Sequence, residues 1–301
     1  MSTNTGNIAA LLRPGLKAIV GELPSYPEQY AEIFSYHTSD KYQEIEVEMR
    51  MPGIADIKPE GMPTATDSSI GQRIITNYIH KTVGLNEILT KETIRDNLYN
   101  REFPRLAVSL RTSLRTAKNV LLTNILNNAF NAAYPIGDGQ SVCSATHPVD
   151  GGFYSNVTPA PAAFSETTVE TMLIQIQGFV MQSGILAQTM AKKLIIPKEL
   201  QFSASRLLNS SFRVGVANND INAMYHGDYI PEGYRVNHYL TSPTSFFILT
   251  DSPDGFKLYQ RDTVETDTHA DYITNNIMMK AEERYSGGIT NPRGVIGSQG
   301  V

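Results

Sequence analysis

Residues 42–51 have the sequence YQEIEVEMRM, and this strict alternation of apolar and polar side chains decides the fold. Successive side chains of a β-strand point to opposite faces, so the alternation predicts a half-buried strand. A second extended stretch follows at about residues 72–85, and a segment rich in Pro and Gly separates the two. We therefore predict a long β-hairpin, called the ribbon below, with an irregular tip.

The ribbon needs a partner surface, because a lone two-stranded hairpin is marginal in water. Ten residues of strand span roughly 33 Å at about 3.3 Å per residue. If that surface belongs to another subunit, the apolar side of the ribbon contacts the neighbour and the Glu side faces solvent or basic groups. The residues expected at this intersubunit contact are Ile45, Val47, Met49 and Met51, with Lys58 near the tip.

The strongest helical pattern covers residues 103–130, where apolar side chains recur at steps of three and four. It predicts an amphipathic helix on the order of 40 Å long, at about 1.5 Å per residue. Residues 1–40 lack a sustained period and predict an arm that packs on its own subunit or a neighbour. Downstream, helices alternate with buried strands, residues 234–240 and 245–250 predict a hairpin-like connection, and residues 273–286 predict a final long strand.

Composition excludes several classes of function. The chain has 301 residues, 41% of them apolar, which is enough for a substantial core. A net charge of −5 and scattered basic residues argue against a dedicated DNA-binding protein. No window reaches the roughly 18 to 20 apolar residues of a membrane span, and residues 1–20 do not predict a secretion signal. The single cysteine, Cys143, fits a reducing cytoplasm.

No catalytic, metal or cofactor site is predicted. Ser144, His147 and Asp150 come nearest to a triad, but their spacing in a loop resembles no known nucleophile placement, and loop hydrogen bonding is favoured. The histidines are dispersed and give no zinc-ligand spacing, and no glycine-rich nucleotide motif is present. A soluble hydrolase that uses the His147 loop is the alternative from a different class.

Several segments carry a family resemblance over nearly the whole chain. They are LLRPGL (11–16), HTSDK (37–41), QRIITNYIHK (72–81), NNDIN (218–222), PEGYRV (231–236), TDSPDGF (250–256) and ERYS (283–286). These segments look like the Mu-like prophage major head subunit family. The order of the predicted elements likewise resembles the Hong Kong 97-type capsid fold.

The resemblance implies an α+β fold with four parts. Residues 1–37 would be an N-terminal arm, 38–85 the extended loop formed by the ribbon, 86–133 with 263–301 the peripheral domain with its spine helix, and 134–262 the axial domain. In this fold axial domains meet around five- and six-fold axes, while arms and extended loops lie over adjacent subunits. The chain would then be the major capsid protein of a tailed bacteriophage.

The same resemblance implies partners and a location. The subunit would bind copies of itself as hexamers and pentamers of an icosahedral virion shell, assembled in the host cytoplasm around double-stranded DNA. A separate scaffolding protein, a portal protein and a decoration protein are the further candidates. The founding member of the fold crosslinks a Lys to an Asn, for which Lys58 is the candidate here. An encapsulin-like nanocompartment shell, which shares the fold, is the alternative.

A basic stripe lies on the predicted spine helix, with Arg111, Arg115 and Lys118 at positions i, i+4 and i+7. In the resembling fold this helix lies near the inner surface of the shell. The stripe would either screen phosphates of packaged DNA without sequence preference, or pair with acidic groups of a neighbouring chain, or be solvated.

Overall fold

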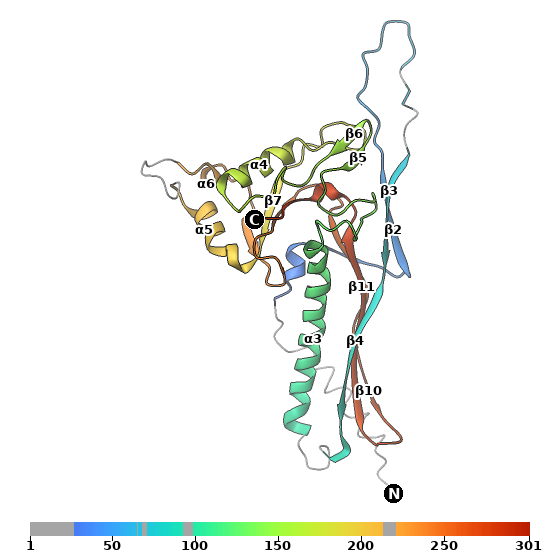
Figure 1. Cartoon of the computed structure of the whole chain (residues 1–301). Helices are drawn as coiled ribbons and strands as arrows, with labels where there is room; N and C mark the ends of the chain where they lie inside the picture. The colour runs from blue at the N-terminus through green and yellow to red at the C-terminus, as the bar shows by residue number, and fades with distance from the viewer. Residues whose placement is uncertain (1–26, 65, 68–70, 93–98, 213–220) are drawn as a thin grey trace.

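The computed structural model describes residues 27–64, 66–67, 71–92, 99–212 and 221–301. Most of the predicted N-terminal arm, and its LLRPGL segment, therefore lie outside the described residues. Within those residues, no helix is both long and apolar enough to cross a membrane. Two four-stranded sheets and the two-stranded ribbon organise this part of the chain (Figure 1).

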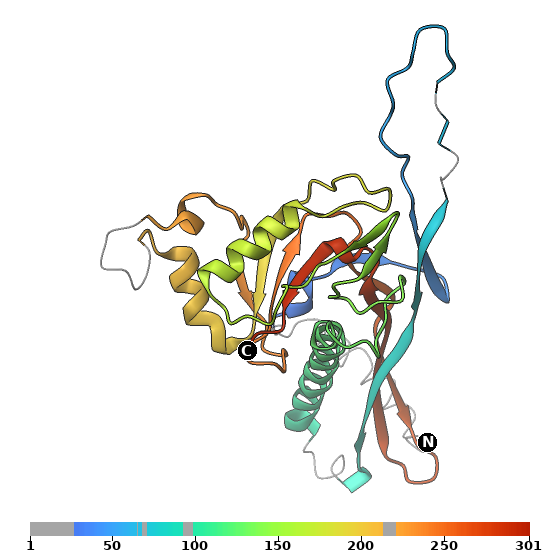
Figure 2. The same ribbon diagram turned by 45° about the horizontal axis from the view of Figure 1, so that its top comes forward.

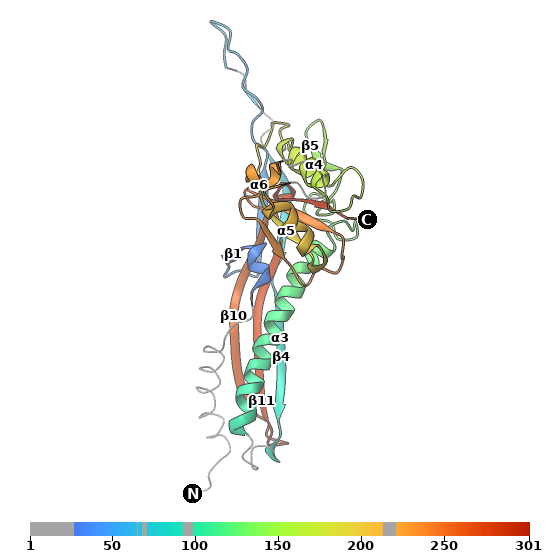
Figure 3. The same ribbon diagram turned by 90° about the vertical axis from the view of Figure 1, so that its left-hand side faces the viewer.

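The first sheet is long and is covered by one helix. Its strand order is β1-β10-β11-β4, with β1 parallel to β10 and the other pairs antiparallel. Helix α3 runs along the sheet, as Figures 1 and 3 show from two sides. Alternate side chains of β11, such as Met279 and Ala281, are buried, and so are Leu114 and Leu122 of α3. The bounds are β1 Ser35–Thr38, β4 Lys81–Leu89, α3 Tyr99–Asn127, β10 Phe256–Ala270 and β11 Ile277–Ile289.

The second sheet has the order β12-β9-β7-β8, and its central strands β7 and β9 are almost continuously buried. Helix α4 begins after Ser165, whose hydroxyl accepts a hydrogen bond from the N–H of Thr168 and caps the helix. The bounds are α4 Glu166–Gln177, β7 Ala191–Ile196, α5 Gln201–Asn209, α6 Ala223–His226, β8 Tyr234–Val236, β9 Phe246–Thr250 and β12 Val295–Ser298.

The ribbon consists of β2 (Gln43–Met49) and β3 (Gln72–Ile79), which pair antiparallel with Val47 opposite Ile75. Beyond the paired strands, residues 50–64 extend past the rest of the subunit (Figure 2). After β3 the chain continues through His80 into β4, so the predicted second strand of the hairpin divides between the ribbon and the first sheet. The remaining short elements are η1 Gln29–Glu32, β5 His147–Val149, β6 Gly152–Tyr154, η2 Lys198–Leu200 and η3 Pro292–Gly294.

The structure confirms the long helix and the ribbon and corrects two predictions. The predicted helix of residues 103–130 is α3, shifted a few residues toward the N-terminus. The predicted hairpin-like connection of β8 and β9 is wrong, because β7 lies between them and pairs with both. Sequence reasoning also missed β10, the longest strand among the described residues.

Candidate functional site

One face of the ribbon makes polar contacts within its own subunit. Glu46 accepts a hydrogen bond from Lys257 Nζ at 2.5 Å and another from the hydroxyl of Tyr259. Glu48 accepts from Arg293 Nη1 at 2.8 Å, and the Arg293 side chain is almost fully buried. The Glu side of β2 therefore lies against basic groups and a hydroxyl of the body.

The opposite face of the ribbon is apolar and open. Ile45 is 54% exposed, Val47 37% and Met49 60%, and Ile75 and Ile79 of β3 are about half exposed beside them. Contiguous exposed apolar surface on a soluble protein marks a site of protein contact. We call these five residues the outer ribbon face. Alternation in β2 produces it directly, because the Glu residues between them turn inward.

The tip end of the paired strands is held to the body by further contacts. Asp150, at the β5–β6 turn, forms ion pairs with both Arg50 and Arg73, which lie at the end of β2 and in β3. A nearby loop approaches so closely that a Cβ at Gly137 would lie 2.6 Å from Thr76 Oγ1. These contacts hold the middle and the tip end of the paired strands to the body.

The tip of the ribbon is exposed. Met51 is 57% exposed, Ile54 81% and Ile57 95%, and Lys58 is also exposed. These side chains are available to another molecule. The structure places Met51 and Lys58 beyond the paired strands, whereas Ile45, Val47 and Met49 lie within β2; their intersubunit role stays a prediction.

The predicted basic stripe needs a correction at Lys118. This side chain is buried and donates hydrogen bonds to Glu283 Oε2 at 3.1 Å and to Gln260 Oε1 at 2.5 Å. Its ammonium group also lies over the rings of Tyr30 and Tyr285, 5.3 and 4.7 Å from their centroids. Lys118 is therefore buried and paired within its own chain.

The physical reason is the phase of the helix. Lys118 follows Leu110 and Leu114 at steps of four, so it falls on the buried stripe of α3. Arg115 lies one residue-step away from that stripe, is partly exposed and forms an ion pair with Glu28 at 2.6 Å. Arg111 is partly exposed as well. The spacing of four residues from Leu110 and Leu114 indicates that Lys118 is buried, and the prediction of a basic stripe considered only its charge.

The residues that come nearest to a triad do not assemble one. His147 is fully buried, with Nδ1 2.5 Å from Asp138 Oδ2 and Nε2 2.9 Å from Asn156 Oδ1. Ser144 Oγ instead bonds Gln140 and Thr146. Ser144 and His147 thus form the predicted loop hydrogen bonds, whereas the Asp150 side chain pairs with Arg50 and Arg73 of the ribbon. Among the described residues, no three metal-ligating side chains gather to hold an ion.

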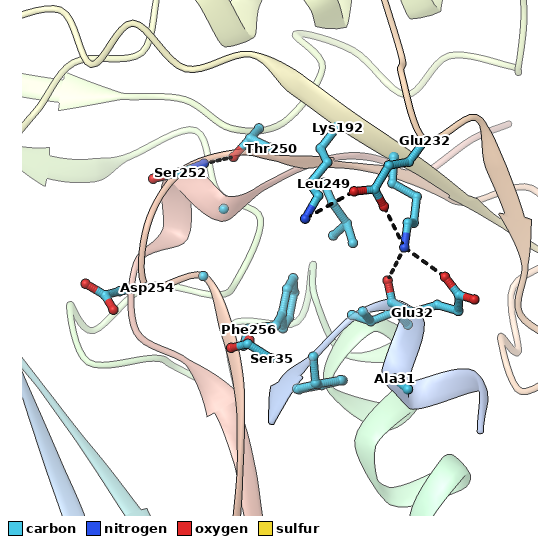
Figure 4. A pocket seen from close by; sticks show the side chains of 15 residues that line it. Ala31, Glu32, Ser35, Lys192, Glu232, Leu249, Thr250, Ser252, Asp254 and Phe256 are labelled. Carbon is cyan, nitrogen blue, oxygen red and sulfur yellow. Dashed lines mark hydrogen bonds and ion pairs between the residues drawn. The ribbon is translucent and has the colours of Figure 1, made fainter. Parts of the chain in front are cut away.

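A pocket lies where η1 meets β7, β9 and the start of β10 (Figure 4). Lys193 crosses it and contacts Glu32 at 2.8 Å and Glu232 at 2.9 Å. Hydrogen bonding to Lys193 holds the pKa of both carboxyls below the ordinary value. The residues lining it include neither His nor Cys. The ion pair of Lys193 with Glu32 therefore connects η1 to the second sheet.

Comparison with known proteins identifies the family. A family model described as phage capsid protein matches residues 76–298, about three quarters of the chain. The chain belongs to this phage capsid protein family. A search of curated proteins found no match.

Solved structures give the fold of this phage capsid protein. The capsid of an empty GTA particle matches with a TM-score of 0.58 at 11% identity, over 91% of this chain and 90% of that one. The capsid of Myoviridae phage XM1 gives 0.58 at 7% identity, over 93% and 94%. A virus-like particle from Pyrococcus furiosus gives 0.56 at 10% identity, over 95% and 97%. The predicted Hong Kong 97-type α+β fold is confirmed, while the narrower Mu-like resemblance is not.

Proposed function

We propose that this phage capsid protein is a major head subunit that assembles into hexamers and pentamers of an icosahedral shell around double-stranded DNA. The family match and the likeness to assembled capsids support self-assembly. The observation that carries the proposal is the outer ribbon face, whose apolar side chains are exposed while the Glu side makes polar contacts within the subunit.

The mechanism is association through many repeated contacts. The outer ribbon face would pack on an adjacent subunit, and the exposed tip with Lys58 would extend the contact. Burying an aliphatic side chain contributes about 1.5–3 kcal/mol, so two or three such residues per ribbon give a weak contact that a shell multiplies. The proposal also divides the chain into an arm, an extended loop, a peripheral domain and an axial domain, as the resemblance to the capsid fold implies.

Other partners belong to the proposal as well. Scaffolding, portal and decoration proteins would contact the shell during assembly in the host cytoplasm. Non-specific contact with packaged DNA would fall to Arg111 and Arg115 of the predicted stripe, which are partly exposed although Arg115 also pairs with Glu28, whereas Lys118 is buried. The phage capsid family match favours a phage head over an encapsulin-like compartment. No enzymatic activity is proposed.

The test is a pair of ribbon variants. Ile45→Asp with Val47→Asp places charge on the outer face and is expected to abolish shells, as seen by electron microscopy and sedimentation. Both residues are exposed in the subunit, so its free energy of unfolding should change by less than about 0.5 kcal/mol each.

The matched control is Ile45→Val with Val47→Ile, which keeps the face apolar and should assemble. Shells formed by the Asp variant at the wild-type yield would show that the ribbon is not the intersubunit contact. If the control variant also failed to assemble, the loss of shells in the Asp variant would reflect the changed shape of the side chains and not their charge.

A further inference from the structure

A buried histidine lies where the second strand of the ribbon passes into the body of the subunit. His80 is the single residue between β3, which pairs with β2, and β4, which pairs with β11. The chain reaches the other strand of the ribbon past Ser39, whose N–H donates to the carbonyl of Gln260 at 3.0 Å. His80 is 4% exposed and Ser39 5% exposed. Ser39 and His80, one at each crossing between ribbon and body, are therefore buried and in contact.

Hydrogen bonds fix the form of His80 in this joint. Ser39 Oγ already donates to Glu44 Oε1 at 2.8 Å, so it accepts from His80 Nε2, which lies 3.1 Å away. The other nitrogen, Nδ1, then accepts from the hydroxyl of Ser286 on β11 at 2.9 Å. Neutral His80 thus ties the two crossings to each other and to the sheet.

The surroundings oppose a positive charge on His80. Burial lowers the pKa of His80, and Arg284 of β11 and Arg261 of β10 lower it further. Glu44 of β2 and Asp262 of β10 act in the opposite direction and are outweighed. Protonation of Nδ1 would also turn it into a donor. The hydroxyl of Ser286, which donates to neutral Nδ1, would then have to rotate in order to accept.

We propose that His80 is a protonation-controlled hinge: neutral His80, together with the ion pairs of Glu46, Glu48 and Asp150 further along the strands, holds the ribbon in the orientation seen here, and protonation of His80 in mild acid weakens this hold and favours the released ribbon. The inference concerns a joint within one subunit. It is therefore independent of which surface the outer ribbon face contacts.

The direction of the pH effect follows from linkage. In the released ribbon His80 is solvated, and its pKa returns to the ordinary value of about 6.5. The released state then binds more protons than the seated one, because the seated pKa lies lower. The contribution of His80 to holding the ribbon is complete above about pH 6.5 and is lost as the pH falls. The equilibrium constant for release of the ribbon rises by at most tenfold per pH unit.

Hydrogen exchange on the full-length chain measures the opening. Peptides covering residues 39–49 and 72–80 are followed from about pH 7.5 to about pH 5, with rates corrected for the intrinsic pH dependence of exchange. In the wild type, protection of both peptides should fall together with acid, with a slope that approaches one proton. Peptides from β7 and β9 should stay unchanged over the same range.

Two variants and a control decide the assignment. His80→Gln can still donate and accept but does not titrate, so its protection should not change with pH. His269→Gln removes an exposed histidine of β10 and should behave as the wild type. Ser286→Ala removes the donor to Nδ1 and should move the midpoint of opening to higher pH.

The proposal fails if wild-type protection is independent of pH, if His80→Gln keeps the acid response, or if His269→Gln loses it. If circular dichroism shows that the His80→Gln variant is unfolded, the Ser286→Ala variant decides the test. A midpoint that does not move in that variant overturns the proposal.

Discussion

Replacing Lys118 by Met is expected to destabilise the subunit strongly, because Lys118 and Glu283 form a buried ion pair. The two side chains are 8% and 4% exposed, and Nζ lies 3.1 Å from Oε2. At that distance and an effective dielectric constant of about 20, the attraction is roughly 5 kcal/mol. Removing one partner leaves the Glu283 charge buried, and such truncations cost about 3–5 kcal/mol. We expect a loss in this range.

Urea unfolding followed by circular dichroism and tyrosine fluorescence measures the loss, since the chain has 15 Tyr and no Trp. Adding Glu283→Gln to Lys118→Met removes the orphaned charge and should recover much of the stability. Lys198→Met is the matched control, because its side chain is 67% exposed and the loss should stay below about 0.5 kcal/mol.

The reasoning would be refuted if Lys118→Met unfolded within about 1 kcal/mol of the wild type while its particles failed to retain DNA. Lys118 would then face the interior of the shell, as the helical charge pattern alone indicates. Recovery in the double variant is the stronger sign of the intrachain pair, since the carboxylate of Glu283 would repel phosphate and its removal would not restore a contact of Lys118 with DNA.

Three further predictions follow from other contacts. Asp150→Asn should raise hydrogen exchange at the tip end of the paired strands while global stability falls by no more than about 1 kcal/mol, because its ion pairs with the ribbon are partly exposed. Burial raises the pKa of the Cys143 thiol, so alkylation followed by mass spectrometry should find it unreactive in the folded chain at pH 8 and reactive in urea. Because Lys193 lowers the pKa of Glu32 and Glu232, their contribution to stability is complete above about pH 4.3 and lost as the pH falls further; denaturation across pH 3 to 6 should show a smaller acid loss in Lys193→Met.

The ribbon and the spine helix could be predicted because each has a sustained period. Alternation in residues 43–49 specifies both faces of β2, and the steps of three and four in α3 specify its buried stripe. Lys118 shows the limit of that reasoning. Its position marks it as buried, but its partner Glu283 lies 165 residues away, and nothing local identifies it.

Strand β10 was missed for a related reason. Its sequence FKLYQRDTVETDTHA is buried at the start and exposed along much of its second half, so it lacks a single period. Its place is set by β1 on one side and by β11 on the other. The Glu face of the ribbon depends on similarly distant residues, since Glu46 meets Lys257 across 211 positions and Glu48 meets Arg293 across 245.

Electron cryomicroscopy of the purified chain tests most directly whether this phage capsid protein works by binding copies of itself through the ribbon. We expect closed shells of hexamers and pentamers in which Ile45 and Val47 are buried against an adjacent subunit. Small discrete particles would contradict self-assembly, and shells whose outer ribbon face stayed in solvent would contradict the role assigned to the ribbon.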